Sequence, residues 1–144
     1  MADLDPLIRF RKYGVDEKQR LLAQLYREYE ALDQQKQQIE SRMDRESELA
    51  RSMGTAEAMV FLGAYLEGAR KRCKILESSM AKMDARIALA QEDMRQAFAE
   101  MKKVSIVARR RRDALKTAQS KKESQMFDET AIDRYRREIT EEPE

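Results

Sequence analysis

Apolar residues recur along the chain at alternating steps of four and three residues, which is the heptad spacing of a coiled coil. The pattern begins after Asp3–Pro6, a helix start in which Asp supplies a cap and Pro fits the first turn. One set of seam positions comprises Ile8, Val15, Leu22, Tyr29, Met43 and Ala50, with a break at Lys36. The other comprises Leu4, Leu25, Leu32, Ile39 and Met53, with breaks at Arg11, Lys18 and Glu46.

The best turn signal lies between Arg51 and Glu57. Gly54 can adopt the left-handed conformation that ends a helix, and Thr55 can cap the next one. Beyond it the seam resumes at Leu62, Leu66, Ala69, Cys73, Leu76, Met80, Met83, Ile87, Ala90, Met94, Ala97, Met101, Val104, Ala108, Arg111, Leu115 and Ala118. Past residue 118 the seam becomes polar at Lys122, Gln125, Glu129 and Arg136.

This pattern predicts an all-α fold, a single coiled-coil domain over residues 1–144 in which two long helices form an antiparallel hairpin. We expect helix one at about 5–52, a turn at 53–56, helix two at about 57–139 and an acidic, disordered tail at 140–144. Leu4 should then lie near residue 107. At 1.5 Å per residue the second helix rises about 120 Å and the first about 70 Å. The end of the second helix therefore projects alone and should fray past residue 118 without a partner.

Composition narrows the function. The 144 residues include no His and no Trp, and 39% are charged with a net charge of +2. Without His, general acid–base catalysis near neutral pH and di-iron bundles built on Glu-x-x-His are disfavoured. The lone Cys73 cannot form an internal disulfide, and no apolar run approaches the roughly 18 residues of a membrane span. We expect a soluble, cytoplasmic, non-enzymatic protein with no cofactor and no metal.

The strongest charge feature runs from Met101 to Lys122, where nine basic residues stand against the single acid Asp113. It includes four consecutive arginines, Arg109, Arg110, Arg111 and Arg112, which point in every direction around a helix. A solvated face is one interpretation, but the run favours a docking surface for a partner. Nucleic acid is the alternative ligand, although no aromatic residue is interleaved to stack on bases.

Apolar side chains off the seam gather at both ends of the predicted rod, and such clusters indicate surfaces that a partner covers. Near the hairpin tip they are Leu49, Phe61 and Tyr65. Near the termini they are Leu7, Phe10, Tyr13, Ile106 and Val107. We therefore expect two protein-binding sites, one at each end.

The layout resembles the FliJ family, the small coiled-coil component of the bacterial flagellar protein export apparatus. The resemblance rests on the start Leu7–Lys12, a first helix of about fifty residues, the Gly-Thr turn followed by Phe61–Leu66, and a basic second helix. The segment Phe127–Arg134 is similar to a late segment of the family. Where some relatives carry several tyrosines late in helix one, this chain has Ile39, Met43 and Leu49.

The resemblance implies a stalk-like regulator of the export ATPase ring in flagellum biogenesis, motility and chemotaxis, which also serves as a general export chaperone for other chaperones or cargo. By the same resemblance, Leu7, Phe10 and Arg109, Arg110, Arg111 and Arg112 would bind the ATPase, and Leu49, Phe61 and Tyr65 would bind the membrane export gate. The protein would be peripheral at the cytoplasmic face of the inner membrane through these partners, with no direct membrane insertion.

Two alternatives stay open on the sequence alone. A stalk of a virulence-type secretion system would show the same features, and a coiled coil that binds nucleic acid through residues 102–122 would share the basic run. We expect no nucleic acid among the partners. We also favour a monomer over a dimer, although the seam of helix two could pair with a second copy or serve in a purely structural spacer.

Overall fold

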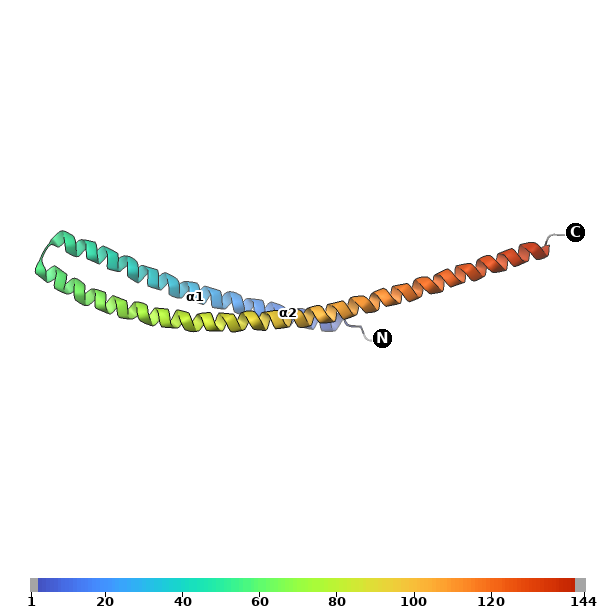
Figure 1. The fold of residues 1–144 in the computed structure, drawn as a ribbon, viewed down its shortest axis with the longest axis horizontal. Coiled ribbons are helices and arrows are strands. Elements are labelled where there is room, and N and C mark those ends of the chain that lie inside the picture. The colour runs from blue at the N-terminus through green and yellow to red at the C-terminus, as the bar shows by residue number, and fades with distance from the viewer. Residues whose placement is uncertain (1–2, 142–144) are drawn as a thin grey trace.

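The computed structural model describes residues 3–141, which form two helices, α1 (Asp5–Met53) and α2 (Ala56–Glu141). The helices lie side by side and antiparallel from a hairpin turn, and α2 continues far beyond the start of α1 (Figure 1). No strand occurs among the described residues. The predicted all-α hairpin with a longer second helix is confirmed.

The turn between the helices uses the two residues that the sequence indicates. Gly54 has φ of 64°, in the left-handed region, and its backbone N–H donates to the carbonyl oxygen of Ala50 at 3.2 Å. The Thr55 hydroxyl oxygen accepts the backbone N–H of Ala58 at 3.2 Å and so satisfies one free donor at the start of α2.

The other helix ends differ slightly from the predicted bounds. At the start of α1, Leu4 occupies the capping position, and the carboxylate of Asp3 accepts the backbone N–H of Asp5 at 3.0 Å. The acidic cap thus acts from Asp3, one residue before the capping position. Thr140 and Glu141, which we placed in the tail, belong to α2. Residues 142–144 of that tail lie outside the described residues.

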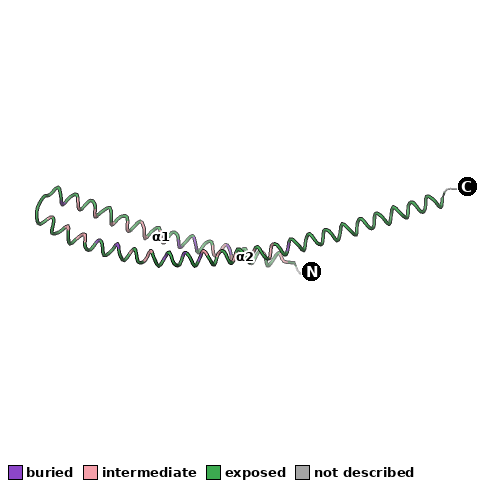
Figure 2. Tube along the Cα trace, viewed as in Figure 1, coloured by how far each residue is buried: buried purple, intermediate pink, exposed green. Residues whose placement is uncertain are grey.

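The core is the narrow seam that the heptad pattern predicts. Its ten buried apolar residues all occupy predicted seam positions: Val15, Leu22, Leu25, Ala50, Ala69, Cys73, Met83, Ile87, Ala90 and Ala108. The densest part lies midway along the hairpin, where Leu22 and Leu25 pack against Met83, Ile87 and Ala90. A two-stranded seam shields only one side of each helix, so most other positions of the rod stay accessible to water (Figure 2).

Polar side chains pair between the two helices along the edges of the seam and at two of its breaks, Lys18 and Lys36. In the shortest of these links, the side-chain nitrogen of Gln91 donates to the hydroxyl oxygen of Tyr26 at 2.6 Å. Lys18 lies 3.9 Å from Asp93. Leu4 and Ala108 line the same small cavity, which agrees with the prediction that Leu4 lies near residue 107.

Lys36, the break in the first seam set, lies between two carboxylates. Its Nζ is 3.1 Å from Oε1 of Glu77 on α2 and 3.8 Å from Oε1 of Glu40 on its own helix. The hydrogen bond to Glu77 and the attraction of that carboxylate raise the pKa of Lys36 above its ordinary value. The lysine therefore stays charged inside the hairpin seam at neutral pH.

We call residues 109–141 the overhang, because every one of them is exposed (Figure 2). The 33 residues span about 50 Å at 1.5 Å per residue. Arg111 and Leu115 continue the predicted seam but are exposed, since α1 begins at Asp5 and offers them no partner beyond that point. The helix is continuous here to Glu141. Fraying of the overhang in solution stays a prediction.

Candidate protein-binding surfaces

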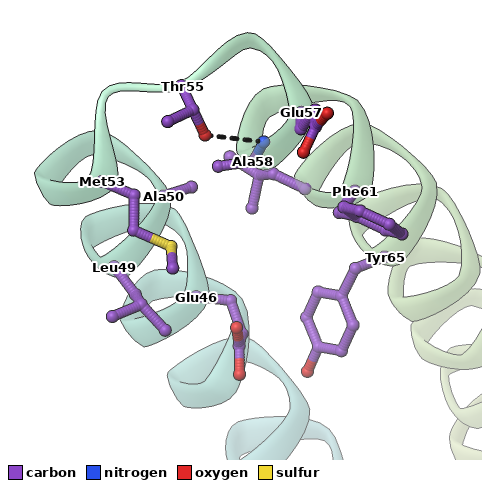
Figure 3. A pocket seen from close by; sticks show the side chains of 10 residues that line it. Glu46, Leu49, Ala50, Met53, Thr55, Glu57, Ala58, Phe61 and Tyr65 are labelled. Atoms are coloured by element: carbon purple, nitrogen blue, oxygen red, sulfur yellow. Dashed lines mark hydrogen bonds between the residues drawn. The ribbon is translucent and has the colours of Figure 1, made fainter.

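The hairpin tip carries a groove of about 500 Å³ between the end of α1 and the start of α2, which we call the tip groove (Figure 3). Two turns of each helix contribute side chains, and the turn itself closes one end. Its lining residues are Glu46, Leu49, Ala50, Met53, Thr55, Glu57, Ala58, Phe61, Leu62 and Tyr65.

The structure brings the three predicted tip residues into this one groove. Leu49 is 53% exposed and Phe61 75% exposed, and Tyr65 is half-buried with its ring turned toward α1 (Figure 3). The sequence interpretation missed Met53 and the acidic Glu46. Met53 was assigned to the seam, but the helices end there, so its side chain is free to line the groove. The groove is thus apolar at its centre with a carboxylate at its edge.

The opposite end of the hairpin, which we call the base, joins the start of α1 to residues 97–115 of α2. Arg112 donates from its guanidinium to the Asp5 carboxylate at 2.9 Å, the last polar link between the helices. A small cavity of about 160 Å³ lies beside this link. Its lining residues are Asp3, Leu4, Asp5, Ala108, Arg111, Arg112 and Leu115.

The structure does not gather all the predicted ATPase-binding residues into one pocket. Phe10 is 68% exposed and lines a separate groove of about 250 Å³ with Tyr13, Gly14 and Ala97. Leu7, at 39% exposed, lines neither this groove nor the cavity beside Arg112. The base therefore presents two neighbouring depressions along the rod rather than a single site.

The four arginines start where the pairing of the helices stops. All four are exposed, and Arg112 alone among them forms an ion pair with a described residue. Successive helical residues are turned by about 100°, so the four guanidinium groups surround α2 on all sides. Two to three turns before them, Lys102 lies over the ring of Phe98, with its Nζ 5.4 Å from the ring centroid, a cation–π contact. We call these four arginines the basic collar. The base thus carries basic side chains on all sides of α2, with aromatic rings nearby.

The overhang holds further exposed apolar side chains that the sequence interpretation did not single out as a site. They are Met126, Phe127, Ile132, Tyr135 and Ile139, each at least 51% exposed. The signal was present, because the second helix is longer than the first and an apolar residue beyond the start of α1 has no partner helix to cover it.

Within residues 3–141 no three or more Cys, Asp and Glu side chains lie together as ligands for a metal ion. Neither described helix has a stretch long and apolar enough to cross a membrane. Both findings concern the described residues alone.

The fold and its surfaces define a class: a two-helix coiled-coil rod whose exposed apolar and basic groups are concentrated at its ends, as in proteins that act by binding others. The comparison with family models agrees with this class. The model described as the flagellar FliJ protein matches residues 1–140, and the chain belongs to the FliJ family. It is therefore associated with flagellar protein export, in a family of non-enzymatic components. No curated protein and no solved structure matches the chain.

Proposed function

We propose that this protein is a stalk-like regulator of the flagellar export ATPase, with its base and overhang inserted in the ATPase ring and its tip in contact with the export gate. It would also escort other export chaperones or their cargo. It acts in the cytoplasm, is held at the inner membrane by its partners and carries no catalytic group of its own.

The observation that supports the ATPase contact most strongly is the state of α2 beyond Ala108. There the helix loses its partner and at the same point presents four exposed arginines. A solvated helix gains most of its stability from tertiary contacts, which here are absent, so a ring that encloses it would stabilise it. A basic collar also steers the rod toward an acidic opening.

The tip groove supports the gate contact. Exposed Leu49 and Phe61 offer apolar area that the hairpin itself does not cover. Aromatic residues in a concave patch are typical anchors of protein interfaces. Because the tip and the base lie at opposite ends of the hairpin, one rod can reach both partners at once (Figure 1).

The experiment measures binding of the purified protein to the export ATPase and to the cytoplasmic part of the gate protein. The test variant replaces Arg109, Arg110, Arg111 and Arg112 with Glu. A matched control replaces four neighbouring exposed basic residues of the paired part, Arg70, Lys71, Arg72 and Lys74, with Glu, and so makes the same change in net charge.

We expect the test variant to lose ATPase affinity by at least tenfold with its helicity unchanged, and the control to bind like the wild type. Unchanged ATPase binding by the test variant, or an equal loss in the control, would contradict the assignment of the base. For the tip, the double variant Leu49→Ala, Phe61→Ala should weaken gate binding and leave ATPase binding intact. Equal gate binding would contradict that half of the proposal.

Nucleic acid is the second candidate partner, favoured by the basic stretch 102–122. Within that stretch no aromatic residue offers a stacking platform. If binding occurs, its affinity should fall steeply with salt as counterions are released. Absence of binding to single-stranded or duplex DNA and RNA at low salt removes this candidate.

A further inference from the structure

The contact face of α2 does not stop where α1 stops. The positions that continue the seam through the overhang are Arg111, Leu115, Ala118, Lys122, Gln125, Glu129, Ile132, Arg136 and Ile139, and all of them are exposed. Leu115 and Ile132 are each 51% exposed, and Ile139 is 59% exposed. The overhang is therefore an unfinished surface, continuous with the interface that holds the hairpin.

The order of residues along this face is self-complementary. Lys122, Gln125 and Glu129 form its centre, basic on one side and acidic on the other. If a second overhang is laid on the first in the opposite direction, with the two Gln125 side chains near the centre, Lys122 of each copy meets Glu129 of the other. In the same register Ala118 of each copy lies near Ile132 of the other, which puts an apolar pair on each side of the polar centre, and Leu115 lies near Arg136.

The charge of the whole overhang follows the same division. Residues 109–122 hold seven basic residues and one acidic residue, a net charge of +6. Residues 123–141 hold six acidic and three basic residues, a net charge of −3. Antiparallel pairing places each basic half beside an acidic half. Parallel pairing would place Lys122 against Lys122 and Glu129 against Glu129, which is repulsive.

The length of the overhang fits a second copy. The link between Asp5 and Arg112 marks the point where α1 leaves the seam. In the antiparallel register just described, Ile139 of the second copy comes close to Arg111 of the first. The second overhang thus covers the free seam up to the point where α1 begins.

We propose that two copies of this protein pair through their overhangs, antiparallel, into a longer two-stranded rod with a hairpin tip at each end. The central positions of the shared seam are polar, so the dimer is weak and forms only at raised concentration, while dilute protein is the monomer that the hairpin favours. The proposal goes beyond the proposed function, because the pairing needs no export partner. It also implies that a second copy and the ATPase compete for the overhang.

The test is sedimentation equilibrium of the purified full-length protein from about 5 μM to about 500 μM, a range that brackets a weak association. We expect the mean mass to rise from that of a monomer toward that of a dimer. The rise should shrink when salt is added, because exposed charges are screened. A monomer mass at every concentration in low salt would overturn the proposal.

Two charge-reversed variants make the test specific for the antiparallel arrangement. The first replaces Lys116, Lys121 and Lys122 with Glu, and the second replaces Glu129, Asp133 and Glu138 with Lys. None of these residues belongs to the proposed ATPase set, so failure here is distinct from failure of that proposal. We expect each variant alone to remain monomeric at the highest concentration, and an equimolar mixture of the two to dimerise at least as well as the wild type.

Two results would overturn this arrangement. If the wild type dimerises but both variants dimerise equally well, the pairing does not use the complementary halves. If each variant is monomeric and the mixture is monomeric too, the charges do not act between copies. Circular dichroism of each variant checks that the hairpin is folded. We expect it to be folded, because no substituted residue lies in the paired part.

Discussion

The helix α2 has two different environments along its length. Between Ala56 and Ala108 its seam packs against α1, whereas from Arg109 to Glu141 the same heptad spacing faces water. Residue type alone does not explain the change, since Ala108 is buried and the apolar Leu115, one heptad later, is exposed. The difference teaches that burial in a two-stranded rod depends on where the partner helix ends, and that the seam beyond this point is left uncovered.

The largest contrast between the two regions should come from one identical change made in each. Leu25 is 4% exposed in the densest part of the seam, and Leu115 is 51% exposed in the overhang. We expect Leu25→Ala to lower the free energy of unfolding by about 2–4 kcal/mol, because it leaves a cavity among packed side chains. Leu115→Ala should change it by less than about 0.5 kcal/mol.

Thermal unfolding of dilute protein, followed by circular dichroism, measures both values. A cost for Leu115→Ala as large as that for Leu25→Ala would mean that the overhang is packed in the monomer, which would erase the comparison between the two regions.

The paired region depends on the turn that creates it, and glycine substitutions test this with a smaller effect. Gly54 has φ of 64°, so Gly54→Ala should destabilise the hairpin by about 1 kcal/mol. Gly68 is helical with open space around the position of a new side chain, so Gly68→Ala should stabilise by about 0.5–1 kcal/mol. Urea unfolding gives both signs. A Gly54→Ala variant as stable as the wild type would contradict the role of the turn.

The border between the regions is held by a weak link. Asp5 and Arg112 have side chains that are 51% and 62% exposed, so their ion pair is worth at most about 1 kcal/mol. A double-mutant cycle with Asp5→Asn and Arg112→Gln should give a coupling energy of this size. No coupling would place the true end of the paired region before Arg112, nearer Ala108.

The smallest effect appears only in alkali and compares two lysines at seam positions. Because Glu77 raises the pKa of Lys36, this pair contributes stability below the ordinary lysine pKa and loses it as pH rises through the raised value. The stability difference between wild type and Lys36→Met should be constant from about pH 6 to about pH 9 and should change in favour of the variant above about pH 10.

Lys122→Met in the overhang is the matched control, since Lys122 has no such partner in the hairpin. Dilute protein should show no corresponding change for this variant between neutral and alkaline pH. A curve for Lys36→Met that runs parallel to the wild type through pH 11 would show that the Glu77 contact is not formed in solution.

The heptad spacing and turn chemistry were enough to predict most of the fold. Val15 and Ile87 could be placed in the core because an apolar residue at a seam position has one favourable environment in a hairpin, and Gly54 with Thr55 could be placed at the turn because few residues suit those conformations. The site was harder to predict. The sequence does not show that Lys36 meets Glu77, or that Met53 joins Phe61 in the tip groove, because both depend on the register between two helices.

The exposure of the overhang could be predicted only in part. The lengths of the helices indicate that α2 projects, and the polar seam past residue 118 agrees with this. Leu115 was nevertheless placed on the seam, since heptad spacing cannot tell a residue with a partner from one without. Heptad spacing alone therefore does not show which apolar side chains of α2 stay exposed.

Amide hydrogen exchange of dilute protein, with and without the export ATPase, tests the central claim most directly. Alone, the overhang should exchange at least tenfold faster than the paired seam, because no tertiary contact protects it. On addition of the ATPase, exchange should slow in residues 109–122 and around Phe10 and should stay unchanged around Phe61. Equal protection of both regions in the free protein, or slowing at the tip groove instead of the overhang, would contradict the account.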